Sequence, residues 1–150
     1  MSIQLSDEIK GLVNGALANG TPVLIAVVTK DGKPRMSFRG SLQTMDDDKL
    51  SFWARRLEGE TVEGVKAHPD VAVLYRDAPK RHLLQLSGRA RIAADGAERE
   101  RVYEAAPEIE QRADPERKGG GVVIELDRVE GMLGLGEDGR PKLFRLTRDA

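Results

Sequence analysis

Residues 35–75 read RMSFRGSLQTMDDDKLSFWARRLEGETVEGVKAHPDVAVLY, and this stretch predicts much of the architecture. Apolar and polar residues alternate over Arg35–Gln43 and again over Lys49–Arg55, which is the period of a β-strand. An acidic turn joins the two predicted strands, so they lie side by side. Arg39 in the first strand and Arg55 in the second are therefore expected to lie close together.

A short helix follows the second strand. It is predicted over Thr61–Ala67, and Pro69 ends it because the residue before a proline disfavours helical dihedrals. Val71–Tyr75 is apolar throughout, which is typical of a central strand. The free N–H groups at a helix start attract anions. We therefore expect a phosphate or similar anion to bind where the strand arginines meet the start of this helix.

The remaining sequence extends this pattern in both directions. Apolar spacing and turn residues predict further helices over Ser6–Ala18 and Ala97–Ala106. Further strands are predicted over Val23–Val28, His82–Ile92, Val122–Met132 and Pro141–Leu146. Short hairpin connections such as Asp31-Gly32 make the sheet largely antiparallel. The sequence thus predicts a mainly β fold, a small closed or half-open barrel of six or seven strands with short flanking helices. The charged, glycine-rich segment Pro107–Gly121 is interpreted as a mobile loop.

Composition narrows the class of protein. A length of 150 residues favours one domain over 1–150. The 24 basic and 25 acidic residues leave a net charge of −1, without the basic excess of a nucleic-acid binder. There is no cysteine, and no apolar run approaches the ~18 residues of a membrane span. The acidic N-terminus does not resemble a signal peptide, so a cytoplasmic protein without nucleic-acid or membrane partners is expected.

Other kinds of site find little support in the sequence. His68 and His82 are the only histidines, and two histidines fourteen residues apart without cysteines do not predict a metal site. The sequence lacks the G-x-S-x-G motif of a serine hydrolase, and its glycine clusters match neither a P-loop nor a dinucleotide fingerprint.

The order of elements resembles a known family. Helix, three strands, helix, two strands, helix and two strands is the order of the FMN-binding split-barrel family, whose best-known member is pyridoxamine 5′-phosphate oxidase. The resemblance covers approximately residues 8–147. It implies a split β-barrel, FMN as cofactor and a flavin-dependent oxidoreductase of unknown substrate. It also implies an obligatory homodimer whose cofactor site lies across the interface.

The resemblance also assigns residues to the cofactor. Family members grip the FMN phosphate with an arginine in the strand that corresponds here to Arg39-Gly40-Ser41-Leu42-Gln43. The next strand of the family carries an aromatic residue and then a small or hydroxyl residue beside the flavin, and Trp53-Ala54 is similar. Arg55 and Arg56 add positive charge. An exposed Trp53 on a polar strand face is expected either to stack near a planar ligand or to pack in a dimer interface.

At the helix start the chain departs from the family pattern. The family has Ser-Arg-Lys where this chain has Gly59, Glu60 and Thr61. Thr61 can still donate through its hydroxyl, whereas Glu60 must point to solvent or pair with Arg55 or Arg56. Gln85 faces the flavin side of its strand, although the family glutamine occupies another position. The expected cofactor-binding residues are therefore Arg39, Gly40, Ser41, Leu42, Trp53, Ala54, Arg55, Arg56, Thr61 and Gln85.

Two alternatives to an FMN enzyme remain open at this level. The same fold can use a deazaflavin coenzyme, whose acidic tail would suit the arginine cluster. The barrel can also be non-enzymatic and bind haem or a small anion, or hold no cofactor. The C-terminal run Phe144-Arg145-Leu146-Thr147-Arg148 only partly matches the oxidase, so a different substrate is expected. No side chain stands out as a general acid or base, and no catalytic residue is assigned.

Overall fold

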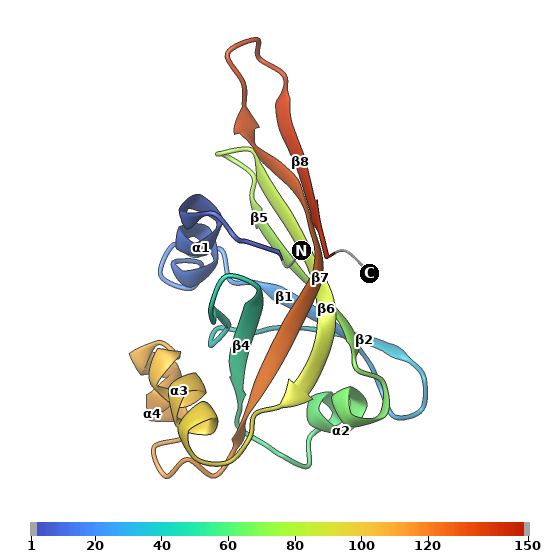
Figure 1. The fold of residues 1–150 in the computed structure, drawn as a ribbon. Helices are drawn as coiled ribbons and strands as arrows, with labels where there is room; N and C mark the ends of the chain where they lie inside the picture. The colour runs from blue at the N-terminus through green and yellow to red at the C-terminus, as the bar shows by residue number, and fades with distance from the viewer. Residues whose placement is uncertain (1–2, 149–150) are drawn as a thin grey trace.

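The computed structural model describes residues 3–148, which form one β-sheet flanked by four helices (Figure 1). None of these helices is long and apolar enough to cross a bilayer. The helices are α1 (Asp7–Asn14), α2 (Glu60–Ala67), α3 (Ala97–Ala105) and α4 (Glu108–Ala113). The strands are β1 (Leu24–Val28), β2 (Pro34–Phe38), β3 (Gln43–Thr44), β4 (Lys49–Ala54), β5 (Asp70–Asp77), β6 (His82–Ile92), β7 (Gly120–Leu135) and β8 (Pro141–Thr147).

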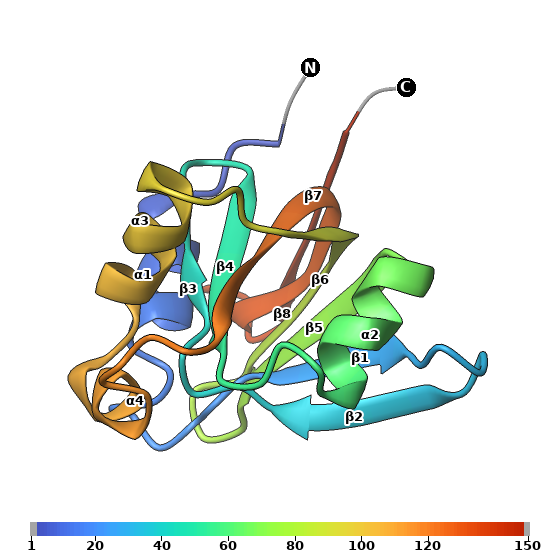
Figure 2. The ribbon, with the colours of Figure 1, turned by 90° about the horizontal axis from the view of Figure 1, so that it is seen from below.

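Every strand pair in the sheet is antiparallel. The strand order is β2-β1-β5-β6-β7-β4-β3, and β8 pairs with the C-terminal half of β7. The two ends of this path, β2 and β3, do not pair with each other, so the curled sheet stays open along one seam (Figure 2). The predicted mainly β, antiparallel split barrel is confirmed, with eight strands where six or seven were expected.

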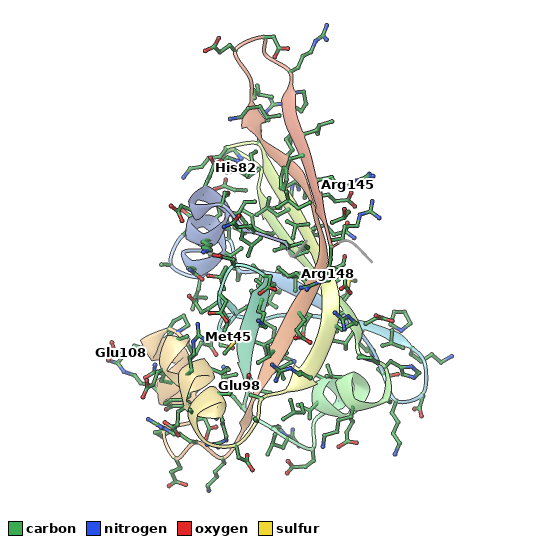
Figure 3. The ribbon with its side chains drawn as sticks, viewed as in Figure 1. Met45, His82, Glu98, Glu108, Arg145 and Arg148 are labelled. Atoms are coloured by element: carbon green, nitrogen blue, oxygen red, sulfur yellow. The ribbon has the colours of Figure 1, made fainter. Side chains whose placement is uncertain are left out.

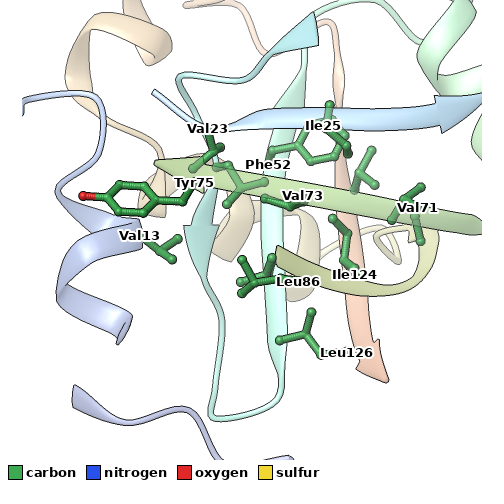
Figure 4. Close-up of a cluster of buried hydrophobic side chains, with 14 of the residues drawn as sticks. Val13, Val23, Ile25, Phe52, Val71, Val73, Tyr75, Leu86, Ile124 and Leu126 are labelled. Carbon is green, nitrogen blue, oxygen red and sulfur yellow. The ribbon is translucent and has the colours of Figure 1, made fainter. Parts of the chain in front are cut away.

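The core fills the inside of the curled sheet. Charged side chains such as Glu108 and Arg145 project from the surface (Figure 3), whereas alternate strand residues point inward. Phe52 and Val73 are fully buried in this core (Figure 4). Burial of each such side chain contributes about 1.5–3 kcal/mol, so the core is the main source of stability. The strand alternation seen in the sequence therefore identifies most of the inward-facing residues.

The strand expected over Arg35–Gln43 is broken in two. β2 pairs with β1 and ends at Phe38, whereas β3 pairs with β4 at the other edge of the sheet. The chain crosses the open seam between them, where the Ser41 hydroxyl donates to Trp53 O (3.2 Å) and accepts from Trp53 N (3.0 Å). The prediction that the apolar residues of this strand face the core was wrong: Met36 and Phe38 are 70% and 67% exposed, because they lie on the outer side of the sheet.

The segment expected as a mobile loop, Pro107–Gly121, contains the ordered helix α4. The Tyr103 hydroxyl donates to the carbonyls of Gln111 (3.0 Å) and Asp114 (3.1 Å). The Asp114 carboxylate in turn accepts from Trp53 Nε1 (2.9 Å) and from the Gly119 amide (2.8 Å). The high charge of the segment hid these partners, which lie elsewhere in the sequence.

Helix α2 packs closely against β1 and β6. Val62 and Val65 are buried, and a Cβ added to Gly64 would come within 2.6 Å of Val28 O in β1. A glycine at this position lets the helix backbone approach the strand closely. The approach brings the first turn of α2 to the end of β2, as the sequence predicted.

Candidate anion-binding site

A pocket of about 350 Å³ opens at the end of β4, between the start of α2 and helix α4. The two helices flank this end of the barrel in both ribbon views (Figures 1 and 2). Eight of the ten residues assigned from the sequence line the pocket. They are Arg39, Gly40, Ser41, Trp53, Ala54, Arg55, Arg56 and Thr61. The residues assigned from the sequence therefore lie largely around one pocket, and Arg39 follows directly after the end of β2.

Arg39 lies at the base of the pocket. Its Nη2 donates to Thr61 Oγ1 at 2.6 Å, which ties the end of β2 to the first turn of α2. Its guanidinium carbon lies 5.2 Å from the centroid of the buried Phe52 ring, a cation–π distance. Its Nε is buried and has no hydrogen-bond partner within residues 3–148. The guanidinium is thus held in place with a donor still free.

The charge of Arg39 lacks a direct counter-ion among the described residues. Burial lowers the pKa of Arg39, and the nearby charge of Arg55 lowers it further, whereas Glu110 acts in the opposite direction. A buried cation without a partner is costly, and an anion bound beside it removes that cost. The electrostatics of the pocket therefore favour an anionic ligand.

Thr61 and the start of α2 supply further donors. Because Thr61 Oγ1 accepts from Arg39, its own hydroxyl proton is free to donate to a ligand. The N-cap residue Gly59 makes no side-chain cap bond, and the first helical amide to find a carbonyl is that of Glu63. The amides before it have no acceptor within the helix. The first turn can therefore donate backbone hydrogen bonds to an anion.

Glu60 lines the pocket but pairs with an arginine outside it. Its carboxylate pairs with Arg35 Nε at 3.3 Å, and both side chains are more than half exposed. The sequence predicted solvent or a pairing with Arg55 or Arg56, and the partner is instead Arg35 of β2. Sequence reasoning missed this partner, although Arg35 lies on the same strand face as Ser37, two strand periods before Arg39; Arg35 does not itself line the pocket. This pairing reduces the repulsion that Glu60 would otherwise exert on an anion.

Glu110 is a second carboxylate at the pocket, and sequence reasoning did not find it. It projects from α4 and accepts from Arg55 Nη2 at 3.2 Å. A Cβ added to Gly40 would lie 2.5 Å from Glu110 Oε1, so a glycine at 40 leaves room for this carboxylate. No sequence signal pointed to Glu110, because its segment was interpreted as a loop.

The Trp53 side chain faces away from the pocket. It is 3% exposed, donates to Asp114 Oδ2 at 2.9 Å and meets the Tyr103 ring edge-on at 4.9 Å between centroids. The expected exposed tryptophan on a polar face was therefore wrong. Trp53 is neither exposed nor free to stack on a ligand in the pocket, because its side chain anchors the segment that carries α4.

Three other assigned residues have different surroundings from those expected. The Ser41 hydroxyl lines the pocket, but both of its hydrogen bonds go to the Trp53 backbone. Leu42 is 2% exposed and belongs to the core. Gln85 is exposed on the outer side of the sheet and does not line the pocket. The geometry therefore concentrates polar ligand contacts on Arg39, Arg55, Arg56 and Thr61.

Comparison with known proteins adds a family match. A sequence profile described as pyridoxamine 5′-phosphate oxidase matches residues 6–131, which is most of the chain. No curated protein matches the sequence.

Several solved structures share the fold. One is described as a putative pyridoxamine 5′-phosphate oxidase from Lactobacillus delbrueckii, with 21% identity, a TM-score of 0.62 and coverage of 84% of this chain and 93% of that one. PhzG from Burkholderia lata 383, in complex with tetrahydrophenazine-1-carboxylic acid, has 14% identity, a TM-score of 0.70 and coverage of 95% and 86%. A haem-binding protein from Mycobacterium smegmatis has 17% identity, a TM-score of 0.66 and coverage of 92% and 57%. At these identities the likeness concerns the fold.

Proposed function

The chain belongs to the pyridoxamine 5′-phosphate oxidase family, and on that premise we propose that it binds FMN, with the phosphate in the pocket at Arg39. The main support for the proposal is the environment of Arg39. Its guanidinium contacts Thr61 and Phe52, the residue is half-buried, and its buried Nε has no hydrogen-bond partner within the described chain. Guanidinium groups bind phosphate through charge-assisted hydrogen bonds.

The residues around Arg39 fit a phosphate group. The Thr61 hydroxyl and the free amides of the first α2 turn supply neutral donors, and Arg55 and Arg56 supply charge. Pockets that enclose whole small molecules hold roughly 300–1,000 Å³. At about 350 Å³ this pocket lies at the lower end of that range, so it suits the phosphate end of FMN rather than the whole molecule. The exposed Phe38 ring at the rim offers an apolar surface beyond the phosphate.

The proposed activity is a flavin-dependent oxidoreduction. FMN would supply the redox chemistry, and the protein would bind and orient it. Arg39, Thr61 and the α2 amides would hold the phosphate, and no residue is assigned as a proton donor or acceptor. The substrate class stays open.

We further propose that the protein is a homodimer with the cofactor site at the interface. Backbone pairing places Phe38, Leu24 and Leu74 in one row on the outer side of the sheet, next to Gln85. This outer face consists of Leu24, Met36, Phe38, Leu74, Leu83 and Leu143. Met36, Phe38 and Leu143 are more than two-thirds exposed, and exposed apolar side chains gathered on one face are typical of a protein interface. Because Phe38 also lines the pocket, a second copy on this face would border the cofactor and bring Gln85 toward it.

A non-enzymatic barrel that binds haem or a small anion is the second candidate. It is favoured by two carboxylates, Glu60 and Glu110, that already pair with Arg35 and Arg55 and reduce the charge available to a phosphate. The haem-binding protein of the same fold makes haem a reasonable probe. A deazaflavin coenzyme is a further alternative within the same pocket.

The absorbance spectrum of the purified protein and a titration with FMN test the proposal. We expect flavin bands, or flavin binding on addition of FMN, and Arg39→Ala should weaken FMN binding by about 1.5–3 kcal/mol, as for a lost charged hydrogen bond. Arg140→Ala makes the same charge change in an exposed turn and should leave the affinity unchanged. A Soret band would favour haem. A colourless protein that ignores FMN, or an unchanged affinity in Arg39→Ala, would contradict the proposal.

A further inference from the structure

We propose that Glu110 is an internal competitor for the anion-binding pocket: its carboxylate holds Arg55 when the pocket lacks a ligand and is displaced when an anion binds. This inference rests on the proposed function, in which an anionic ligand binds at Arg39. In this proposal the free energy needed to break the Glu110–Arg55 ion pair is subtracted from the binding free energy of the ligand.

The position of Glu110 is the first argument. Its carboxylate lines the pocket, 3.2 Å from Arg55 Nη2, and its side chain is 19% exposed whereas that of Arg55 is 56% exposed. An added Cβ at Gly40 would come within 2.5 Å of Oε1, so the glycine leaves room for the carboxylate in its present position. A carboxylate in this place uses the same arginine that a ligand's phosphate would use.

The charge of the pocket is the second argument. Three arginines and two glutamates line it, namely Arg39, Arg55, Arg56, Glu60 and Glu110, so three positive and two negative charges leave a net charge of +1. A phosphate monoester carries about −1.5 to −2 at neutral pH. Movement of Glu110 away from Arg55 would raise this net charge from +1 to +2, close in magnitude to the charge of the ligand, whereas Glu60 is held by Arg35, which does not line the pocket.

The anchoring of α4 is the third argument, because it lets Glu110 move alone. The C-terminal end of the helix is held by Gln111 Nε2, which donates to the carbonyls of Tyr103 (3.2 Å) and Ala106 (2.9 Å), and by the Tyr103 hydroxyl on Asp114 O. The Glu110 carboxylate has a single ion-pair contact with a half-exposed arginine. Breaking such a pair costs little, and it leaves the helix in place.

Competition of this kind favours ligands with contacts beyond the anion. Because the same ion pair must be broken for every ligand that uses Arg55, the affinity of each falls by the same factor. A small anion, which depends on the pocket alone, then falls below useful affinity. A phosphate ester with an apolar portion against Phe38 retains binding. Glu110 would thus lower the affinity for free phosphate and for a phosphate ester by the same factor, and only the ester would have further contacts to offset the loss.

The test compares Glu110→Gln and Glu110→Asp with Glu108→Gln by calorimetric titration of inorganic phosphate and of FMN. Gln removes the charge, whereas Asp keeps the charge on α4 but shortens the side chain by one methylene and so lengthens its contact with Arg55. Glu108 points outward from the same helix, where it pairs with Arg112, and does not line the pocket (Figure 3). We expect both Glu110 variants to bind both ligands about two- to fivefold more tightly, the range of an exposed ion pair, and Glu108→Gln to match the wild type.

The outcomes separate this inference from the proposed function. If Glu110→Gln binds more tightly but Glu110→Asp does not, Glu110 acts through its charge alone and is not displaced. If both variants bind more weakly, Glu110 positions Arg55 for the ligand, and the inference is overturned. Unchanged affinity in both variants, with binding still lost in Arg39→Ala, overturns the inference but keeps the proposed function. Absence of phosphate and FMN binding in every variant overturns both.

Discussion

At the scale of single residues, charged side chains here act through specific partners. Glu98 is an example outside the pocket. It accepts two hydrogen bonds from Arg91, at 2.6 and 3.0 Å, and one from the Ala94 amide at 2.8 Å, just before α3 begins. The bond from Arg91 is the main reason that the pKa of Glu98 falls from 4.5 to about 2. This carboxylate therefore links β6 to the start of α3.

We predict that Glu98→Gln lowers the free energy of unfolding at pH 7. The folded pKa lies below the unfolded one, so the stabilisation is present above pH 4.5 and is lost as the pH falls toward 2. Because both side chains are partly exposed, the expected loss is about 1 kcal/mol rather than the full value of the shift. Urea unfolding at pH 7 and near pH 2 measures it, with the exposed Glu104→Gln on α3 as control. A difference that persists undiminished near pH 2 would contradict this account.

At the scale of elements, the approach of α2 to β1 positions the anion pocket. Gly64 is the point of contact, where an added Cβ would meet Val28 O at 2.6 Å. The Arg39–Thr61 hydrogen bond depends on this approach, because Thr61 lies one turn earlier on the same helix.

We predict that Gly64→Ala destabilises the protein by about 1–3 kcal/mol, because the helix must move away from the strand. The same movement should weaken binding of phosphate or FMN at the start of α2. Thermal unfolding and calorimetric titration measure the two effects. Gly11→Ala is the matched control: it lies in α1 with nothing within 4 Å of an added Cβ, so a stabilisation of up to ~1 kcal/mol is expected. Equal effects of both substitutions would show that α2 is not tightly packed.

At the scale of the whole molecule, the outer face carries most of the large apolar side chains that stay exposed in the described chain. It runs across the sheet from the edge strand β2 to β8 and meets the pocket at Phe38. A homodimer through this face would bury its leucines and place two pockets at one interface. The pocket would then gain residues that one chain does not bring to it.

We predict that the wild-type protein elutes with the mass of two chains in size-exclusion chromatography with light scattering. Leu74→Glu places a charge in the middle of the outer face and should shift the protein toward one chain and weaken FMN binding. Ile109→Glu is the control, since Ile109 is 67% exposed on α4, away from this face. Wild-type protein that remains a single chain at micromolar concentration would refute a shared site.

Local sequence patterns were sufficient for most of the elements and for bringing several of the assigned residues to one pocket. Strand alternation, the Asp-Gly turns and the Pro69 boundary depend on neighbouring residues, so they predicted β6, α2 and the arginines that meet at the pocket. The resemblance in element order predicted the split barrel, and the family match confirmed the membership.

Long-range contacts determined the rest. The strand from Arg35 breaks because β2 and β3 pair with opposite edges of the sheet. Trp53 turns inward because Asp114, 61 residues later, accepts its indole proton. Glu110 reaches Arg55 from 55 positions away, through a helix whose charged sequence shows little apolar periodicity. Local patterns carry no information on such pairings. The free energy of a long-range contact arises only when the folded chain brings the two distant partners together.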